Sequence, residues 1–484
     1  MGFCTLLANV ALADTKLVPA DYGTIQGAIN ASNTGDTILV SPGTYNETIS
    51  FFGKDITVQS TNGAAQTIID AGSQFYRCVD FFNKETSSAV LDGFTLINGY
   101  TINDGGGIRV TGGANPTIQN VVIENCSAVR YGGGVYASRG TFNNVTIRQC
   151  DSGNEDCGMY LFGSGLDEPI IIENCLIENC RSGVIVAIDV EAKPSFQDCK
   201  FDNLGGYGVL IEYGRTAVVT NCEFKNSGSG MRIDGQGAFN GQNSNTEIIN
   251  CSFMDNDRDG LEIEVYSYAN DEILLPEIRG CLFIGNGIEG GAASKGGIYL
   301  DCQSTGLNES AIIDNCNFSE NHGLSPSGNS ITLTGSGAAG ARVSNSTFCE
   351  EGATAIIGDY VNYGGNVFLE DCTTVDGGCC VDSECIILTE SDCLKINGTF
   401  RGPGSDCDNT TCGDTSGFGA CCVNGAAVLL TAEECDLISG TFLGSGSEPG
   451  DAACPTGCNA DINGDGQVDG QDLAQVLSFW GICE

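Results

Sequence analysis

The final part of the sequence carries oxygen-bearing side chains at the spacing of a calcium-binding loop. The segment DINGDGQVDGQD spans residues 461–472 and places Gly466 at the sixth position, where such a loop turns sharply. The donors at positions 1, 3, 5, 9 and 12, and the backbone carbonyl at position 7, would come from Asp461, Asn463, Asp465, Asp469, Asp472 and Gln467. We therefore predict one Ca²⁺ site here. The alternative is a polar Asp/Gly turn that binds no ion.

A second set of reactive side chains lies in glycine-led segments in the middle of the chain. Four carboxylates and one guanidinium recur there at related places, namely Glu212, Asp234, Glu264, Asp301 and Arg232. Tyr160 and Tyr299 occupy the neighbouring column and are candidates for stacking on sugar rings. Carboxylates one strand apart suit a retaining glycosidase, and those two strands apart approach the inverting separation. These residues are catalytic or binding candidates; the alternative is a solvated acidic face.

The positions of these residues depend on an internal repeat of about 25 residues. A short motif around cysteine recurs as ENCLIEN, QDCKFDN, NCEFKN, NCSFMDN, GCLFIGN and DNCNFSEN between residues 173 and 321. Each motif is followed by glycine and an alternating apolar segment such as GVLIEY or GLEIEV. Strands at this period, with no helical pattern between them, indicate rungs that bury one another's faces. We predict an all-β right-handed parallel β-helix over roughly residues 36–372.

The composition of the cysteine motif follows from such stacking. Equivalent residues of a parallel stack recur every ~4.8 Å, so the inward position must hold a compact side chain such as cysteine. We expect one inward column, mostly of free thiols, made of Cys175, Cys199, Cys222, Cys251, Cys281 and Cys316. The Phe or Ile two residues later should fill the core, and the Asn residues should tolerate left-handed turns and form amide ladders.

Charge and hydropathy exclude some classes of partner. The 484 residues include 62 acidic and 20 basic side chains, which gives a formal net charge of −42. Such a chain would repel nucleic acid and anionic membranes, so we expect neither as a partner. The sequence contains no run of about 18 or more apolar residues, so no transmembrane helix is predicted. The acidic surface suits calcium, cationic partners or a salty medium.

The first residues resemble the end of an export signal. The stretch FCTLLANVALA is apolar, and Ala11-Leu12-Ala13 fits a small-residue cleavage site, so residues 1–13 are interpreted as a signal peptide whose basic start lies upstream. The alternative is a buried N-terminal strand. Export to the medium or the cell surface would suit the 27 cysteines, of which an even number remains once Cys4 is removed.

The composition changes after Cys372. From Cys379 onward, 12 cysteines occur in about 105 residues, in two similar segments at about 378–412 and 419–457. This density predicts a disulfide framework, whose pairing cannot be deduced from sequence. We expect residues 373–457 to form two small stapled modules that act as a spacer between the β-helix of residues 14–372 and the calcium segment of residues 458–484.

The segment TIQGAINASNTGDTILVSPGTYNETI, residues 24–49, resembles the opening of secreted β-helix proteins of the pectate-lyase-like superfamily. The resemblance implies a short helical cap with Ile25, Ala28 and Ile29 on its apolar face. The FxxN pairs, such as Phe253–Asn256, and the GGx pairs are similar to repeats of bacterial polymorphic outer-membrane adhesins. These resemblances cover about 350 residues and are specific for the fold alone, because β-helices host lyases, hydrolases, epimerases and adhesins.

The C-terminal segment resembles one dockerin calcium repeat, in which Asp fills position 12. Leu473, Val476, Leu477 and Trp480 follow at helical spacing. The resemblance implies a cohesin-like or cell-envelope receptor as partner. Dockerins generally carry two such repeats and this sequence has one, which leaves cohesin binding open.

Two functions from different classes are compatible with these observations. The first is an exported surface or matrix protein that presents an acidic β-helix face to polysaccharide or another partner and is tethered through its C-terminal modules. The second is a polysaccharide lyase or glycoside hydrolase that uses the outward carboxylates. The catalytic motifs typical of polygalacturonases and alginate epimerases are missing, and the single histidine, His322, occupies a turn of the repeat. We therefore favour the first and leave enzymatic activity open.

Overall fold

A computed structural model describes most of the chain, which divides into two compact units, residues 1–372 and 373–484. In the first unit the described residues are 13–369, apart from breaks at 73–74, 155–156, 165–168, 190–192, 213–214, 236–245, 268–275, 288–294, 305–310, 324–329, 335–340 and 350–354. In the second unit they are 377–381, 384–388, 393, 399–400, 418–423, 426–431 and 441–442.

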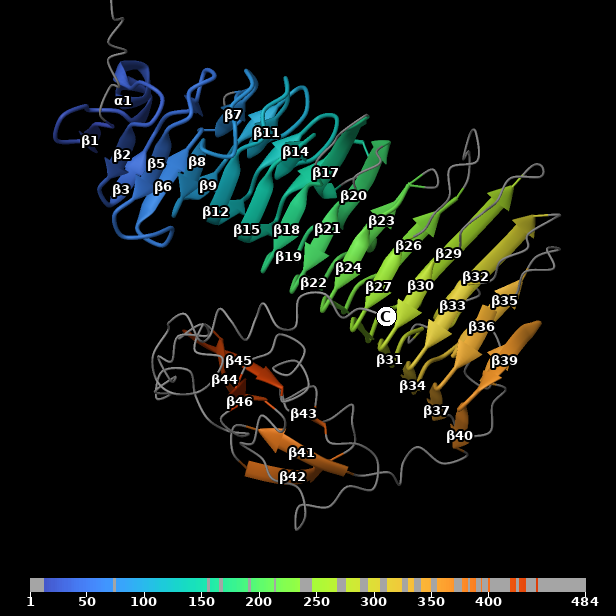
Figure 1. The fold of residues 1–484 in the computed structure, drawn as a ribbon. Helices are drawn as coiled ribbons and strands as arrows, with labels where there is room; N and C mark the ends of the chain where they lie inside the picture. The colour runs from blue at the N-terminus through green and yellow to red at the C-terminus, as the bar shows by residue number, and fades with distance from the viewer. Residues whose placement is uncertain are drawn as a thin grey trace, which may run out of the picture. The chain divides into compact units, whose positions relative to one another are not determined.

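The first unit is an all-β solenoid of parallel strands (Figure 1). Its larger sheet has 25 strands among the described residues, and consecutive rungs pair in parallel register. The strands are β1(Thr15–Val18), β2(Thr37–Val40), β3(Gly43–Tyr45), β5(Thr57–Ser60), β6(Thr67–Asp70), β8(Val90–Asp92), β9(Thr95–Ile97), β12(Thr117–Glu124), β15(Thr141–Arg148), β18(Ile171–Glu173), β19(Leu176–Glu178), β21(Ser195–Gln197), β22(Lys200–Asp202), β24(Val218–Thr220), β25(Glu223–Lys225), β27(Glu247–Ile249), β28(Ser252–Met254), β30(Glu277–Arg279), β31(Leu282–Ile284), β33(Ala311–Asp314), β34(Asn317–Ser319), β36(Ala341–Ser344), β37(Thr347–Cys349), β39(Tyr360–Gly364) and β40(Val367–Leu369).

A second sheet runs along another side of the solenoid and has 12 strands within the described part. These are β4(Ile49–Ser50), β7(Val79–Phe81), β11(Ile108–Val110), β14(Val135–Ala137), β17(Cys157–Ser164), β20(Ser182–Asp189), β23(Tyr207–Ile211), β26(Ser229–Asp234), β29(Asp259–Ser267), β32(Gly296–Ser304), β35(Ile331–Thr334) and β38(Ile356–Ile357). A short third sheet contains β10(Tyr100–Thr101), β13(Ser127–Ala128) and β16(Asp151–Ser152). The predicted parallel β-helix is confirmed.

The N-terminal end of the solenoid is capped by a short helix, α1(Ile25–Ala31). Thr24 caps it, because its hydroxyl accepts a hydrogen bond from the Gly27 N–H at 3.0 Å. The expected apolar face of Ile25, Ala28 and Ile29 is fully buried. The stack starts earlier than residue 36, because β1 pairs in parallel with β2. Among the described residues, none of the helices has the length and apolarity needed to cross a membrane.

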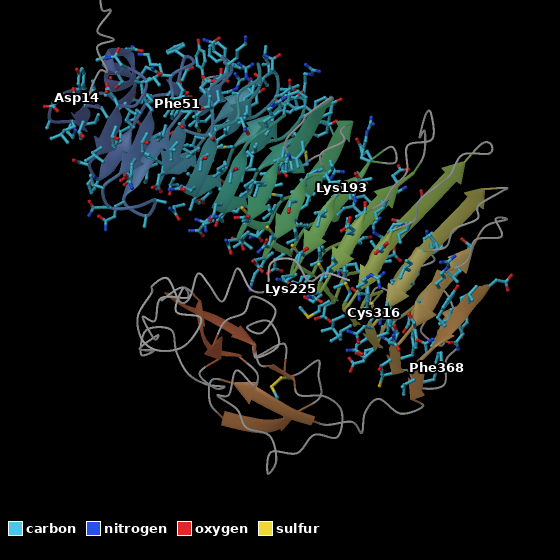
Figure 2. The ribbon with its side chains drawn as sticks, in the orientation of Figure 1. Asp14, Phe51, Lys193, Lys225, Cys316 and Phe368 are labelled. Atoms are coloured by element: carbon cyan, nitrogen blue, oxygen red, sulfur yellow. A yellow bond between two sulfur atoms is a disulfide. The ribbon has the colours of Figure 1, made fainter. Side chains whose placement is uncertain are left out.

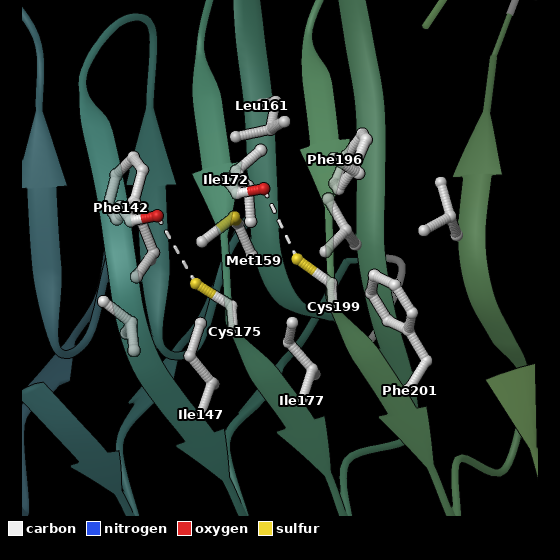
Figure 3. Close-up of a cluster of buried hydrophobic side chains, with 14 of the residues drawn as sticks. Phe142, Ile147, Met159, Leu161, Ile172, Cys175, Ile177, Phe196, Cys199 and Phe201 are labelled. Carbon is white, nitrogen blue, oxygen red and sulfur yellow. Dashed lines mark hydrogen bonds between the residues drawn. The ribbon is translucent and has the colours of Figure 1, made fainter. Parts of the chain in front are cut away.

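The core is built from columns that repeat in every rung (Figures 2 and 3). All six cysteines of the predicted inward column are at most 2% exposed, and all are free thiols. Two residues further on, a row of rings stacks with centroids 4.7 to 4.9 Å apart; it comprises Phe201, Phe224, Phe253, Phe283, Phe318, Phe348 and Phe368. The ring spacing equals the strand spacing, so the parallel register of the rungs sets this stacking.

The corners between strands explain why cysteine is used. Asn174, for example, has a φ of 54° and turns the chain between β18 and β19, which interrupts the backbone ladder. The neighbouring Cys175 thiol donates to the Phe142 carbonyl of an adjacent rung at 3.5 Å, and Cys199 donates to Ile172 at 3.4 Å (Figure 3). Burial raises the pKa of the Cys180 thiol, which keeps that thiol protonated. At the corners themselves, the Cys222 backbone N–H donates to the Cys251 thiol of the next rung at 3.4 Å, so a thiol replaces a backbone acceptor there.

Asparagine has two separate roles at these corners. The left-handed Asn residues lie outside the core and bridge rungs by their amides, as in Asn203 Nδ2 to Asn179 Oδ1 at 2.7 Å. A different, buried ladder runs from Asn256 to Asn286 and Asn321, with amide contacts of 2.8 and 2.9 Å. The expectation of αL turns and amide ladders is confirmed. The asparagines that make the turns are, however, different residues from those of the buried ladder.

The second unit contains two small antiparallel sheets with matching pairings. One has β41(Gly377–Val381), β42(Glu384–Leu388) and β43(Thr399–Phe400), and the other has β44(Phe418–Val423), β45(Ala426–Thr431) and β46(Thr441–Phe442). Cys379 is paired with Phe400 in the strand register of the first sheet, as Cys421 is paired with Phe442 in the second. A disulfide joins Cys379 to Cys393. The structure does not describe the side chains of the other cysteines in the predicted disulfide framework.

The ring ladder makes a testable contribution to stability. Phe253 is fully buried between Phe224 and Phe283, so Phe253→Ala should lower the free energy of unfolding by about 3–5 kcal/mol through lost burial and a cavity. Urea unfolding followed by circular dichroism would measure this loss. Phe82→Ala is the matched control, because Phe82 is 39% exposed. Equal losses in the two variants would contradict a structural role for the ladder.

Candidate functional site

The outer face of the twelve-stranded sheet carries one column of side chains in register. Successive strand pairings place one of its residues above the next at ~4.8 Å. The column reads Asp80, Arg109, Tyr136, Tyr160, Ile185, Leu210, Arg232, Glu262, Tyr299 and Thr332. Tyr160 and Tyr299 share this column, as the repeat predicted. The alternation of each strand turns the next residue into the core.

The predicted carboxylates lie in the neighbouring column, two residues further along each strand. Asp234 on β26, Glu264 on β29 and Asp301 on β32 pair directly with one another. Glu212 follows Ile211, which pairs with Ile233, so it occupies the equivalent place after β23. The structure therefore brings the four carboxylates into one row. They are not a solvated face: the Asp234 side chain is 24% exposed, Glu264 is 13% exposed and Asp301 is buried.

Arg232 neutralises part of this row. Its Nη2 lies 2.7 Å from Glu264 Oε2 and 3.9 Å from Asp234 Oδ2. Its Nη1 donates to the Tyr207 hydroxyl at 2.8 Å. Burial opposes the charged form of Arg232, yet the hydrogen bond to Tyr207 and the nearby carboxylates raise the pKa of the guanidinium. The cost of stacking like charges is therefore offset by a cation from within the chain.

Lys295 supplies the second cation of the cluster. Its Nζ lies 3.3 Å from Glu262 Oε1 and 3.4 Å from the centre of the Tyr299 ring. Burial disfavours its charged form, but the combined attraction of Glu262, Tyr299 and Asp259 raises the pKa of the ammonium. Sequence reasoning missed Lys295 because it precedes β32 and belongs to no repeating column; only its proximity to a glycine-led strand would have pointed to it.

The two predicted sugar-stacking rings are engaged inside the protein. Tyr299 is 8% exposed, lies under Lys295 and accepts a hydrogen bond from Thr334 Oγ1 at 3.0 Å. Tyr160 is 9% exposed and packs against Tyr131 and Tyr136 at centroid distances of 4.5 and 5.8 Å. Neither ring presents a free face, so the structure corrects this expectation. The outward alternation was right, but loop residues cover the rings.

Asp259 is a further carboxyl of the cluster that the sequence did not reveal. It is 2% exposed and accepts a hydrogen bond from the Lys295 backbone N–H at 2.9 Å. Burial, together with the negative charge of Glu262, raises the pKa of Asp259 to about 7. The cluster therefore holds one carboxyl that exchanges its proton near neutrality beside another, Glu262, that is paired with cations.

We found no metal centre in the part of the chain that the structure describes. No three His, Cys, Asp or Glu side chains of these residues converge on a point that could hold an ion. The positive charge in this cluster comes from side chains: Arg232 pairs with Glu264 of the carboxylate row, and Lys295 pairs with Glu262 of the neighbouring column. The predicted calcium donors Asp461, Asn463, Asp465, Gln467, Asp469 and Asp472 lie outside the described residues.

The fold and register agree with a known family. The family described as "Right handed beta helix region" matches residues 53–203 and 185–348, which together exceed half of the chain. The chain therefore belongs to the right-handed β-helix family. No curated protein matches it.

Several solved structures share the fold at low identity. A variant of the catalytic domain of GH87 alpha-1,3-glucanase in complex with tetrasaccharides is 14% identical with a TM-score of 0.46, over 74% of this chain and 70% of that chain. The A-module of the Azotobacter vinelandii mannuronan C-5 epimerase AlgE6 is 14% identical with a TM-score of 0.38, over 67% and 93%. Pectate lyase Pel9A is 13% identical with a TM-score of 0.30, over 72% and 80%. This likeness concerns the fold alone.

The raised pKa of Asp259 predicts a pH-dependent stability. Because the pKa rises from 3.8 to about 7 on folding, the folded state holds an extra proton between these values. Its contribution is complete below the unfolded pKa and is lost as the pH rises through the folded pKa. Asp259→Asn keeps the neutral form at every pH. Relative to this variant, the wild type should therefore lose a few kcal/mol between pH 5 and pH 8, at ~1.4 kcal/mol per pH unit.

Urea unfolding of both proteins at pH 5 and pH 8 would test this dependence. Glu178→Gln on β19 of the other sheet is the control for the general effect of removing one negative charge. Parallel stability profiles of the wild type and Asp259→Asn would show that Asp259 titrates normally.

Proposed function

We propose that this protein is an exported β-helix protein that binds polysaccharide along the outer face of its twelve-stranded sheet. The observation that carries this proposal is the in-register row of Asp234, Glu264 and Asp301, in which the Asp234 and Glu264 side chains remain 24% and 13% exposed. A ligand lying across the strands meets one new side chain per rung at a constant spacing of ~4.8 Å. A linear polymer of repeating units is the chemical class that matches a regular row of contacts.

The charged cluster gives this face its chemical preference. Five carboxylates, those of Asp234, Asp259, Glu262, Glu264 and Asp301, surround Arg232 and Lys295. This surplus of negative charge, in a chain of net charge −42, favours neutral or cationic polysaccharides over polyuronates. Ion pairs that hold each other in place also present hydrogen-bonding groups in fixed positions, which lowers the entropic cost of binding.

Changing the carboxylate row should weaken polysaccharide binding. Asp234→Asn with Glu264→Gln keeps the shape of both side chains but removes two charges that contact Arg232. We expect migration through gels containing neutral polysaccharides to show about tenfold weaker affinity. This is the effect expected when two charge-assisted hydrogen bonds to the ligand are weakened.

The matched control is Glu178→Gln with Asp202→Asn, two acidic residues that pair across β19 and β22 on the other sheet. It removes the same charge and should leave the affinity unchanged. Failure of the wild type to bind any polysaccharide of a neutral, cationic and acidic panel would overturn the proposal.

A second candidate function is glycoside hydrolysis or polysaccharide cleavage by a lyase. It is favoured by the proton-exchanging Asp259 beside Glu262, because an acid and a carboxylate in different environments are what glycoside hydrolysis requires. Release of reducing ends or of unsaturated sugars from the same panel would support it. Loss of that release in Asp259→Asn and Glu262→Gln, with binding retained, would assign the chemistry to this pair. If the wild type binds polysaccharide but releases no reducing ends or unsaturated sugars, the protein binds polysaccharide without cleaving it.

We further propose that residues 458–484 bind one Ca²⁺ and that the C-terminal modules tether the protein to a cohesin-like or cell-envelope receptor. Asp461→Ala combined with Asp472→Ala removes the first and last donors of the loop. Calorimetry of the full chain should show one Ca²⁺ fewer per molecule in this variant. The control is Asp451→Ala, which changes a nearby acidic residue outside the loop and should leave the number of bound Ca²⁺ ions unchanged. Equal stoichiometry in the wild type and the double variant would refute the site.

A further inference from the structure

A groove of about 590 Å³ opens at the N-terminal end of the solenoid, where residues of α1, β4 and β7 line it. Its volume falls within the range of small-molecule sites. Gln26 of α1, Ser50 of β4 and Asp80 of β7 line it, and Asp80 is also the first residue of the outer column. The groove shares none of its lining residues with the charged cluster of Arg232 and Lys295.

Three exposed aromatic rings gather at this groove. Phe52, Phe75 and Tyr76 are 50%, 66% and 64% exposed. Phe75 is positioned by an edge contact with Tyr100 at a centroid distance of 5.3 Å. Exposed rings that converge on a concave surface indicate an interaction site, whereas scattered ones do not.

Two of these rings also stand on an unfavourable backbone. Phe52 and Phe75 have φ values of 52° and 63°, in the left-handed region. Twelve of the nineteen described non-glycine residues with positive φ are asparagines, and these two are the only aromatic residues among them. Bulky side chains are disfavoured in this region. The chain therefore keeps two rings at the groove at a conformational cost that Asn would largely avoid.

The floor of the groove is a rigid ionic layer. Asp80 accepts hydrogen bonds from Arg109 Nε and Nη2 at 2.8 and 2.7 Å and from Arg77 Nη1 at 3.2 Å. Arg77 also donates to the backbone carbonyls of Asp104 and Gly105, at 3.1 and 3.3 Å. Burial lowers the pKa of Arg77, and the charges of Asp80 and Asp104 oppose this shift. Of the residues that line the groove, only Arg77 and Asp80 are charged, so the part of the floor that a ligand meets is close to electrically neutral.

An unused hydroxyl completes the site. Ser50 Oγ is buried at the groove wall and has no hydrogen-bond partner among the described residues. An unpaired buried hydroxyl is uncommon, since such groups are nearly always satisfied in native proteins. A change of its χ1 rotamer would turn it toward a polar ligand atom that enters the groove.

We propose that this groove binds one or two neutral pyranose rings of a saccharide. The apolar C–H face of a pyranose would lie on Phe75 and Tyr76, and its hydroxyls would bond to Ser50 Oγ and to the planar Asp80–Arg77 layer. The balanced floor offers no excess positive charge to a uronate or a phosphate. The inference rests on the residues of the groove and is independent of the charged cluster.

Removing the two most exposed rings tests the site. In the full chain, Phe75→Ala with Tyr76→Ala should weaken the binding of a neutral hexasaccharide by about tenfold in calorimetry. The probes are cellohexaose, laminarihexaose and mannohexaose, with hexagalacturonate as the acidic comparator. Both side chains are largely exposed, so the variant should keep the unfolding midpoint of the wild type. Ser50→Ala should weaken the same binding by a smaller factor.

Two control variants separate this site from others. Tyr363→Ala removes a ring that is 61% exposed at the other end of the solenoid and should leave the affinity unchanged. The cluster variant Asp234→Asn with Glu264→Gln should also retain binding of the hexasaccharides at the groove. The proposal is overturned if no neutral probe binds, if hexagalacturonate binds more tightly, or if the ring variant and Tyr363→Ala behave alike. Loss in the cluster variant with none in the ring variant would instead support the outer column alone.

Discussion

Parallel, in-register hydrogen bonding between consecutive rungs is the constraint on which this structure depends. Each strand finds its backbone partners in the rungs on either side, so every side chain stands over its equivalent at a fixed spacing. Equivalent residues of successive rungs therefore form columns along the axis of the solenoid. The stacked rings from Phe201 to Phe368 show the strength of this constraint, because their centroids repeat at 4.7 to 4.9 Å, which is the spacing of the strands.

The corners of the rungs are where this hydrogen bonding fails and where side chains must replace it. Left-handed asparagines turn the chain, and the buried residue that follows supplies a thiol, a hydroxyl or an amide to the backbone of the preceding rung. The Cys251 thiol accepts from the Cys222 N–H in this way, and the Ser346 hydroxyl accepts from the Cys316 N–H. Cysteine combines small volume with weak donor and acceptor capacity, which explains its repeated use at one inward position. The free thiols are thus structural groups that fill the core and bond to the backbone.

The same constraint acts on the outer face, where it concentrates charge. Equivalent carboxylates are forced together on β26, β29 and β32, and the chain compensates with Arg232 from the neighbouring column and Lys295 from outside the repeat. The result is a compact ionic network of low exposure on a face that is otherwise a regular row of side chains. At the N-terminal end the row meets a groove in which rings and a neutral ionic floor are combined. A face with a repeating one-dimensional pattern is suited to ligands that repeat in one dimension.

The sequence alone determined the fold, the inward cysteine column and the order of the outer columns. It did so because strand alternation and rung spacing relate residue number directly to position, so that Glu264 and Asp301 could be aligned without coordinates. The tertiary structure alone decided what surrounds these columns. Lys295 covers Tyr299, burial changes the proton affinity of Asp259, and the exposed Phe75 faces the groove beside the capping helix. Those residues belong to turns and strand ends, where no periodicity relates sequence to space, and their proximity arises only when the chain has folded.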